Sequence, residues 1–238
     1  MSKKIAFKLR QWHKWLSLAI GGQVLLWLAS GVYMVVVDLD FIHGDHLVTN
    51  MTEIIEAGDE PAVTFAEIVS EYPDATSITL ANWVGRPVYR VTSDEGLKLV
   101  DAGSGVVLSP IQESDAIAVA RFHYTRDNEV RSATLLEDKA DAPSEIQSRP
   151  LPLWRIDFDD PGSTAFYVSP SDGSLVTRRH TYWRLFDFAW MLHIMDYEER
   201  ADVNNPLLRI AAGLGLLLSL AGMCLLFFSF RRRGQIAS

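Results

Sequence analysis

The chain has 238 residues, of which 48% are hydrophobic and 22% are charged, and its formal net charge is −8. Residues 38–202 contain all 30 acidic residues but only 13 of the 22 basic ones, so this stretch has a formal charge of −17 between two basic ends. An acidic middle excludes nucleic acid as a partner, because nucleic-acid binding needs a basic face. The single cysteine, Cys224, excludes a disulfide within the chain.

The N-terminal part combines a basic leader, residues 1–14, with an apolar run, residues 15–37, that has no charged residue. At a rise of ~1.5 Å per residue, this run is long enough to cross the ~30 Å hydrocarbon core of a bilayer. A cleaved signal peptide is the alternative, since residues 29–31 (Ala-Ser-Gly) form an acceptable cleavage site. The apolar run is longer than the ~7–15 residues of a usual signal peptide, so we predict a transmembrane helix at 15–37.

Residues 38–61 form the predicted juxtamembrane segment, which contains the sequence HGDH with His43 and His46. Metal ligands can lie three residues apart on a turn. This spacing matches no strong metal signature and no cysteine supports it. We therefore interpret residues 43–46 as a solvated juxtamembrane loop and predict no metal site.

The middle of the chain contains an internal repeat. Residues 87–91 (PVYRV) match residues 152–156 (PLWRI) at an offset of 65, and residues 100–105 match residues 168–173 at an offset of 68. Each half has an alternating strand, a turn, a second strand, a glycine-containing turn and a short third strand. We place the two repeats at residues 62–111 and 112–178.

A short amphipathic helix is predicted before the strands of each repeat. The first begins with a capping box, Thr64 to Glu67, and ends at Pro73. Its predicted apolar face consists of Phe65, Ile68, Val69 and Tyr72. The second helix begins near Ser114 or Asp115. Its apolar residues are Ala116, Ile117, Val119 and Ala120.

These patterns predict an α+β fold in which each repeat contributes a helix and a set of antiparallel strands, with one sheet face covered by the helix. A unit of ~50–70 residues is only marginally stable alone, so we expect the two repeats to pack on each other. The polar, proline-containing stretch 135–150 is interpreted as a linker within the second repeat.

Residues 179–205 are predicted to form an aromatic helix and a loop at the membrane surface. Within His180–Tyr197, steps of three and four residues place one set of side chains on a single helix face. The set comprises Leu185, Phe186, Ala189, Trp190, His193 and Tyr197. The tryptophan and tyrosine content is typical of a membrane interface. Three arginines, Arg178, Arg179 and Arg184, are expected to meet lipid phosphate.

A second transmembrane helix is predicted at residues 207–230, followed by a basic tail at 231–238. The positive-inside rule places both basic ends in the cytoplasm and residues 38–205 outside, which is the periplasm if the source is a Gram-negative bacterium. Small residues four apart, Ser17 with Gly21 and Ala211 with Gly215 and Ser219, indicate close helix packing. The expected partners are therefore membrane lipids and another membrane subunit or a second copy of the chain.

The order of these segments resembles the PepSY-associated transmembrane family, in a short form with two spans. The similar stretches are RPVYRVTSDEGLKLVDAGSGVVL, LPLWRIDFDDPGSTAFYVSPSDGSLV, WHKWLSLAIGGQVLLWLASG and MLHIMDYEERADVNNPLLRIAAGLGLLLSLAGM. Ser17 stands where the family usually has glycine, and residues 196–205 depart from its pattern. The resemblance covers nearly the whole chain. It implies an α+β fold in which two transmembrane helices flank a periplasmic domain of two PepSY-like repeats.

The resemblance also implies a candidate cofactor. Longer family members with four spans include siderophore-iron reductases that carry haem on membrane histidines, and His13 and His193 occupy similar positions here. A bis-histidine haem needs two imidazoles on facing helices at one depth. Because His13 is predicted at the cytoplasmic side and His193 at the outer side, haem b would have to lie between two chains. The alternative is an aromatic-belt role for His13 and interfacial packing for His193.

The sequence contains no P-loop and no HExxH, CxxC or GxSxG motif, which favours a non-catalytic role. We therefore expect a membrane-anchored periplasmic PepSY-type binding or regulatory subunit, attached to an iron-uptake or redox system. The alternative is a haem-b-carrying electron-transfer subunit of a ferric or flavin reductase system. A periplasmic peptidase inhibitor is a weaker alternative.

Overall fold

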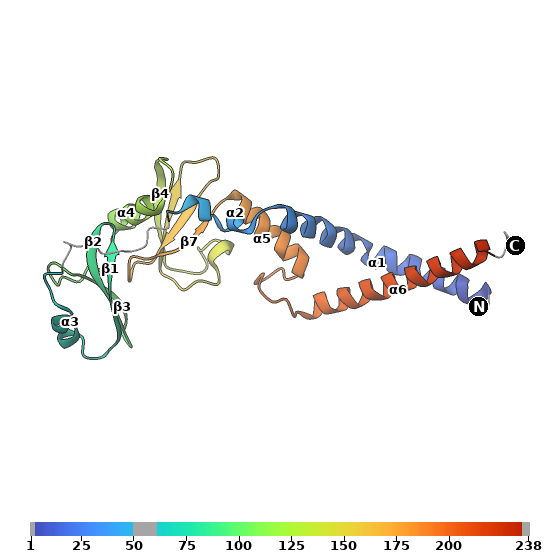
Figure 1. Cartoon of the computed structure of the whole chain (residues 1–238), viewed down its shortest axis with the longest axis horizontal. Coiled ribbons are helices and arrows are strands. Elements are labelled where there is room, and N and C mark those ends of the chain that lie inside the picture. Colours follow the sequence, from blue (N-terminus) through green and yellow to red (C-terminus); the bar gives the residue numbers. More distant parts are fainter. Residues whose placement is uncertain (1–2, 50–60, 235–238) are drawn as a thin grey trace. The chain divides into compact units, whose positions relative to one another are not determined.

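The computed structural model describes residues 3–49 and 61–234 and has an α+β fold. The chain divides into two compact units (Figure 1). The first, named here the helix unit, consists of Met1–Asp38 and Leu185–Ser238. The second, the sheet unit, is Leu39–Arg184.

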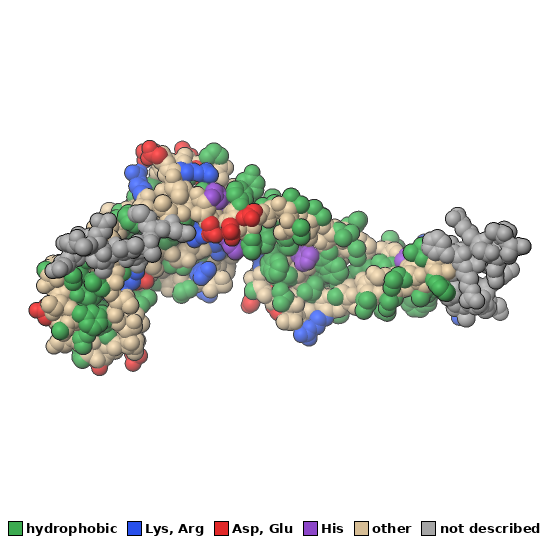
Figure 2. All heavy atoms as spheres, viewed as in Figure 1, with side chains coloured by type: hydrophobic (Ala, Val, Ile, Leu, Met, Phe, Trp, Pro, Cys, Tyr) green, Lys and Arg blue, Asp and Glu red, His purple; other side chains and the backbone are tan. Residues whose placement is uncertain are grey.

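The helix unit is built on two long helices, α1 (Lys3–Val36) and α6 (Pro206–Gly234), which pack on each other. Both contain a stretch long and apolar enough to cross a membrane, at Phe7–Val36 and Pro206–Phe227. Figure 2 shows hydrophobic side chains covering both helices. This part of the predicted architecture, two long apolar helices at the ends of the chain, is confirmed.

Small residues line part of the contact between α1 and α6. Ala211 and Ala221 are buried there, and a Cβ atom on Gly215 would lie 3.6 Å from the ring of Trp27. Two members of the predicted stripe on α6, Ala211 and Gly215, therefore face α1, which lets the backbones approach closely, whereas Ser219 is exposed. A Cβ on Gly21 would meet nothing within 4 Å among the described residues, so Gly21 does not serve this contact.

The first sheet of the sheet unit contains β1 (Ala75–Trp83), β2 (Arg86–Ser93) and β3 (Gly96–Asp101), paired antiparallel in that order. Val84 and Gly85 join β1 to β2 with φ values of 52° and 81°. Two consecutive positive φ values are typical of the two-residue turn that matches strand twist. The short third strand predicted after the second turn of this repeat is present only as a single bridge between Val100 and Val107. Strand β1, which precedes the repeated segment, was not predicted.

The second sheet contains β4 (Val130–Leu136), β5 (Leu153–Phe158), β6 (Ala165–Val168) and β7 (Leu175–Arg179), again antiparallel and in chain order. The linker predicted at 135–150 overlaps the end of β4 and includes the short 3₁₀ helix η2 (Ser144–Ile146). It connects β4 to β5, as expected.

The two sheets share their strand register. Tyr89 pairs with Val100 in the first sheet, and Trp154 pairs with Val168 in the second. These pairs are related by the offsets of 65 and 68 that relate the two segments in the sequence. The strands β1 and β4 also begin with equivalent irregularities, after Ala75 and after Val130.

Helix α3 (Phe65–Glu71) has the predicted capping box between Thr64 and Glu67. Of its predicted apolar face only Ile68 is buried, whereas Phe65 and Val69 are exposed. Because the helix has only seven residues, it covers a small part of the first sheet, and the side chains of Phe65 and Val69 stay in contact with solvent.

Helix α4 (Glu113–His123) begins one or two residues earlier than expected, because Gln112 acts as its N-cap. Its side chain and that of Asp115 form a reciprocal capping box. The predicted apolar face is confirmed for Ala116, Val119 and Ala120, which are fully buried.

The main core lies between the two sheets and joins them to α4. It includes Val88, Leu99, Val119, Ile156, Phe158 and Phe166. A second cluster packs α3 on the opposite face of the first sheet, around Ile68 and Tyr89. A third covers the second sheet with the linker, through Ile146, Leu153 and Tyr167. The expected packing of the two repeats on each other is thus present, because neither sheet buries both of its faces alone.

Candidate functional site

The end of helix α5 (Thr181–Ile194) is held by side chains of the helix unit. Gln23 Nε2 donates to the carbonyl of Leu192 at 3.1 Å, and Trp27 Nε1 donates to that of His193 at 2.7 Å. The amide of Asn205 donates to the carbonyl of Ile194 at 2.9 Å. The last carbonyls of a helix have no partner within it. Here three of them in succession are satisfied by side chains from elsewhere in the unit.

His193, one of the two predicted haem ligands, lies at this helix end. Its Nδ1 is 2.8 Å from the hydroxyl of Ser30, which is buried, and its ring stacks near Trp190 with centroids 6.5 Å apart. A Cβ on Gly31 would lie 3.9 Å from the imidazole, so α1 approaches the ring closely at this point. His193 therefore packs between α5 and α1.

His13, the other predicted ligand, faces α6. A Cβ on Gly222 would lie 3.2 Å from His13 Cε1, so the glycine makes room for the ring. The Nδ1 atom of His13 is buried and has no hydrogen-bond partner within the described part of the chain. A buried polar atom without a partner is uncommon in proteins.

These surroundings do not fit a haem held by the two histidines of one chain. His193 contacts Ser30 of α1, and His13 lies 17 residues earlier on the same helix, which corresponds to about 26 Å along its axis. The prediction that the two imidazoles cannot share one haem agrees with these positions.

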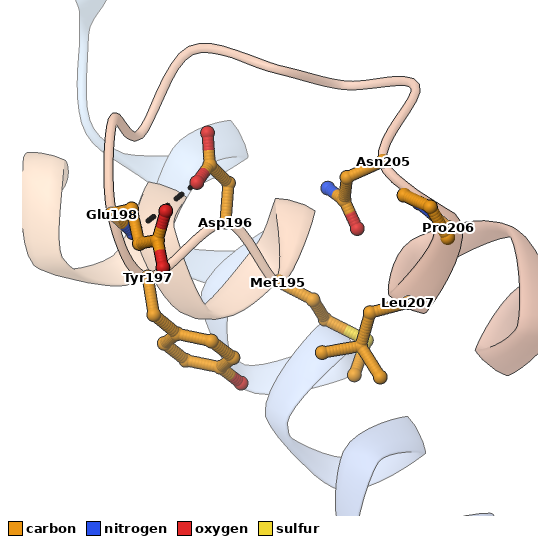
Figure 3. A pocket seen from close by; sticks show the side chains of 7 residues that line it. All are labelled: Met195, Asp196, Tyr197, Glu198, Asn205, Pro206 and Leu207. Carbon is orange, nitrogen blue, oxygen red and sulfur yellow. Dashed lines mark hydrogen bonds between the residues drawn. The ribbon is translucent and has the colours of Figure 1, made fainter.

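The loop between α5 and α6 is organised by one carboxylate and encloses an open cavity of about 330 Å³ (Figure 3). Asp196 accepts the backbone N–H groups of Glu198, Glu199, Ala201 and Asp202. The bonds from Asp202 and Ala201 lower the pKa of Asp196 most strongly. The carboxylate of Asp196 is therefore engaged in shaping the loop, while Glu198 is a second acid in the lining of the cavity.

In the sheet unit, Glu145 is the centre of a buried charged cluster. Arg184 Nε donates to Glu145 Oε2 at 2.6 Å, and the hydroxyl of Tyr167 donates to Oε1 at 2.5 Å. Burial alone would raise the pKa of Glu145, but the hydrogen bonds from Arg184 and Tyr167 outweigh it and keep the pKa below its usual value. Burial and the neighbouring carboxylate raise the pKa of Tyr167.

A second buried carboxylate, Asp160, shapes the turn between β5 and β6. It accepts the N–H and the hydroxyl of Thr164, both at 2.7 Å, and the hydroxyl of Tyr124 at 2.9 Å. Burial raises the pKa of Tyr124, and its bond to Asp160 adds to this effect. All of these contacts are internal, so Asp160 fixes the fold of the turn.

The third polar cluster fastens the segment after α1, which forms α2 (Leu39–His43) and the 3₁₀ helix η1 (Asp45–Leu47). His180 Nε2 lies 3.1 Å from the carbonyls of both Phe41 and Ile42, and Ile42 and Leu47 are buried. Within the predicted HGDH loop, His43 and His46 are exposed, whereas the flanking residues Ile42 and Leu47 pack into the sheet unit. Residues 50–60 of the predicted juxtamembrane segment lie outside the described residues.

The three arginines expected to meet lipid phosphate are engaged inside the sheet unit. Arg178 forms an ion pair with Asp45. Arg179 stacks on the ring of Trp183 and donates to the carbonyl of Glu145. Arg184 binds the carboxylate of Glu145. The arginines therefore hold the domain together.

Sequence reasoning missed Glu145, Asp160 and His180. Glu145 lies in a polar stretch that gave no sign of burial. Asp160 had a local signal, because the spacing of Asp160, Gly162 and Thr164 is typical of a side-chain-stabilised turn. The described residues contain no group of three or more His, Cys, Asp or Glu side chains that could hold a metal ion.

The fold and these sites define a chain in which two long apolar helices flank an α+β unit with two antiparallel sheets, and in which the buried charged groups are paired internally. Comparison with protein-family models, curated proteins and solved structures finds no match to this chain.

Proposed function

We propose that the protein is a membrane-anchored binding or regulatory subunit of the PepSY type, without catalytic activity of its own. The observation that carries this proposal is the division of the chain. Two helices long and apolar enough to span a bilayer pack together at its ends, and the residues between them form a separate α+β unit. This is the organisation of a domain presented at a membrane surface.

The helix unit supports a location in the bacterial inner membrane, with residues 38–205 in the periplasm. Basic residues precede the apolar stretch of α1 and follow that of α6, which favours cytoplasmic ends. The capped end of α5 lies beside Gln23 and Trp27, which belong to the apolar stretch Phe7–Val36, so we place this end within the bilayer and the rest of residues 38–205 in the periplasm. An unpaired carbonyl in hydrocarbon costs several kcal/mol, and Gln23 and Trp27 remove that cost for Leu192 and His193.

The shared register of the two sheets supports the assignment of two PepSY-like repeats. Equivalent strand pairs recur at the same offsets as the sequence motifs, and each set of strands follows a short helix. A binding role is favoured over a catalytic one because the buried carboxylates Glu145 and Asp160 are saturated by partners from their own unit.

The haem-carrying alternative would require a second chain or another membrane subunit. It is tested by the absorption spectrum of protein purified in detergent after expression with adequate haem supply. A Soret band that disappears in His13→Ala or His193→Ala would support this alternative and contradict our proposal. The same spectrum without a Soret band would leave the binding role in place.

The topology can be measured with cysteine labelling in a Cys224→Ser background. Ser148→Cys lies at an exposed position of the sheet unit, and Ser2→Cys lies in the basic leader. A membrane-impermeant maleimide should label Ser148→Cys in spheroplasts, and Ser2→Cys only after lysis. Labelling of Ser2→Cys in intact spheroplasts would overturn the proposed orientation.

The subunit role predicts a stable partner. Protein extracted from its native membrane in mild detergent should migrate as a complex with a fixed stoichiometry of a second polypeptide. A chain that purifies alone and turns over a substrate would contradict the proposal. The contribution of the sheet unit is tested by deleting residues 62–178, which should abolish the complex while the remaining helices still insert.

A further inference from the structure

The two connections between the helices and the sheet unit are fastened to each other. One is the α2–η1 segment, residues 39–47, and the other is the end of β7 with the start of α5, residues 178–182. Arg178 forms an ion pair with Asp45 and donates to the carbonyl of Gly44 at 3.2 Å. Gly44 has a φ of 76°, and a Cβ there would lie 3.3 Å from both Arg178 and His180. The two segments are therefore in close contact.

His180 is the central group of this contact. Only 2% of the residue is exposed, and its Nε2 is 3.1 Å from the carbonyl oxygens of Phe41 and Ile42. Carbonyl oxygens only accept hydrogen bonds, so Nε2 carries the proton in the neutral ring. Further protonation would place a positive charge on a side chain that water barely reaches, which is unfavourable.

A second imidazole lies beside the first. The ring of His46 stacks on Phe41 with centroids 4.6 Å apart and meets the His180 ring edge-on at 5.7 Å. Tyr182 contacts Phe41 from the other segment. The aromatic contact therefore includes two imidazoles, the side chain whose unperturbed pKa lies nearest to neutral pH.

Three arginines act on the two imidazoles: Arg178 of β7, Arg184 of α5 and Arg126 after α4. Each arginine is paired with an acid, Asp45, Glu145 and Asp160 respectively. A proton on either histidine therefore meets carboxylates that arginines already engage.

We propose that His180 and His46 form a proton-sensitive latch, which holds the α2–η1 segment on the β7–α5 connection at neutral pH and releases it as the pH falls. The release would loosen the attachment of the sheet unit to both of its helical connections. This device goes beyond the proposed binding role and does not depend on it, because it concerns contacts within the sheet unit only.

The direction of the pH effect follows from the protonation of His180. Burial lowers the pKa of His180 below its ordinary value of 6.5, and burial likewise lowers that of His46. The latched form therefore binds fewer protons than the open form, in which the histidines are hydrated. The stability of the latch is fully present above a pH of about 6.5 and is lost as the pH falls below it.

Hydrogen–deuterium exchange of the full-length protein in nanodiscs, read by mass spectrometry, tests the proposal. After correction for intrinsic exchange rates, opening of residues 39–49 and 178–184 should increase about fivefold between pH 6.5 and pH 5.5 for each proton taken up. It should change little between pH 7.5 and pH 6.5. The strand β5 serves as the internal reference and should show no such change.

Three variants separate the latch from general acid sensitivity. His180→Gln retains an N–H donor for the carbonyls but cannot titrate, so its exchange should lose most of the pH response and keep only the smaller part that His46 contributes. His46→Gln, at an exposed position, should reduce the response without removing it. The matched control His43→Gln, exposed and in the same α2–η1 segment, should respond like the wild type.

Equal opening of the wild-type segments at pH 7.5 and pH 5.5 would overturn the latch, and so would a full response in His180→Gln. If His180→Gln does not fold, the wild-type profile and the comparison of His46→Gln with His43→Gln decide the question. Neither outcome bears on the topology or partner experiments above.

Discussion

The guanidinium of Arg184 lies against the carboxylate of Glu145, with Nε 2.6 Å from Oε2 and Nη2 3.1 Å from Oε1. Glu145 comes from the linker between β4 and β5, and Arg184 comes from the first turns of α5. The pair therefore connects the polar linker to the helix that leads out of the sheet unit, and the hydroxyl of Tyr167 completes it.

Removal of one partner should be costly, because it leaves a buried charge unpaired. We expect Glu145→Gln to lower the free energy of unfolding of the sheet unit by about 3 kcal/mol. Arg184→Met should cost more, because it leaves the carboxylate of Glu145, only 7% exposed, without its cation, whereas Glu145→Gln leaves an arginine with 32% of its side chain exposed. Denaturant titration of the full-length protein provides the measurement. In the control, Arg131→Met removes the exposed pair with Asp159 and should cost less than about 1 kcal/mol.

The same cluster predicts a loss of stability in acid. The pKa of Glu145 is lower in the folded protein than in the unfolded chain, so its contribution is present above the unfolded value and is lost as the pH falls through the folded one. Unfolding measured from pH 6 down to pH 3 should show a steeper loss in the wild type than in Glu145→Gln. Parallel curves for the two proteins would show that Glu145 is not the responsible group.

The contact between Trp83 and Gly173 should be intolerant of a side chain. Trp83 Nε1 donates to the carbonyl of Gly173 at 3.0 Å, and a Cβ on this glycine would overlap the indole. Gly173 also has a φ of 64°. We expect Gly173→Ala to lower the thermal unfolding midpoint of the sheet unit markedly, through both overlap and backbone strain. Gly85→Ala is the matched control, because Gly85 has a comparable φ of 81° and a Cβ there would meet nothing within 4 Å among the described residues, so this variant measures the backbone strain without the overlap.

Packing of α1 on α6 should depend on Gly222. A Cβ there would lie 3.2 Å from the His13 ring, so Gly222→Val should push the helices apart. A Cβ on Gly213 would meet nothing within 4 Å among the described residues, so the control variant Gly213→Val should be neutral. Thermal unfolding in nanodiscs, followed by helical circular dichroism, distinguishes the two variants. Equal stability of both would mean that His13 is not packed on Gly222.

The cap on α5 provides a fourth site for mutation. Gln23→Leu keeps the size of the side chain but leaves the carbonyl of Leu192 without its 3.1 Å hydrogen bond. We expect a loss of about 1 kcal/mol in the stability of the helix unit, the usual size for a hydrogen bond between membrane helices. Leu25→Ala, at an exposed position of α1, is the control and should have a smaller effect. Comparable losses in both variants would remove the support for a specific cap.

Local signals in the sequence were sufficient for several elements. The capping box of Thr64 and Glu67 and the apolar spacing of Ala116, Val119 and Ala120 depend on residues within one or two helical turns, and both were predicted correctly. Strand β1 was missed because its exposed threonines and serine weaken the alternation, and it is held mainly by pairing with β2. The exposure of Phe65 was missed because the size of the sheet beneath it is not encoded locally.

The buried polar groups could not be predicted for a different reason. Glu145 meets Arg184 across 39 residues of chain, and His180 meets Ile42 across 138. Neither residue differs in its local sequence from an exposed glutamate or a surface histidine. The polar character of the linker in fact indicated exposure, and only its packing over the second sheet encloses the carboxylate.

The sequence by itself determined the two apolar helices, the internal repeat and the positions of the short helices, because length, hydropathy and capping act over a few neighbouring residues. The tertiary structure decided which polar groups are buried and what they contact. It turned His13 towards Gly222, His193 towards Ser30 and His180 towards Phe41. The physical reason is that desolvation and hydrogen bonding depend on partners distant in the chain, which only the packed fold brings together.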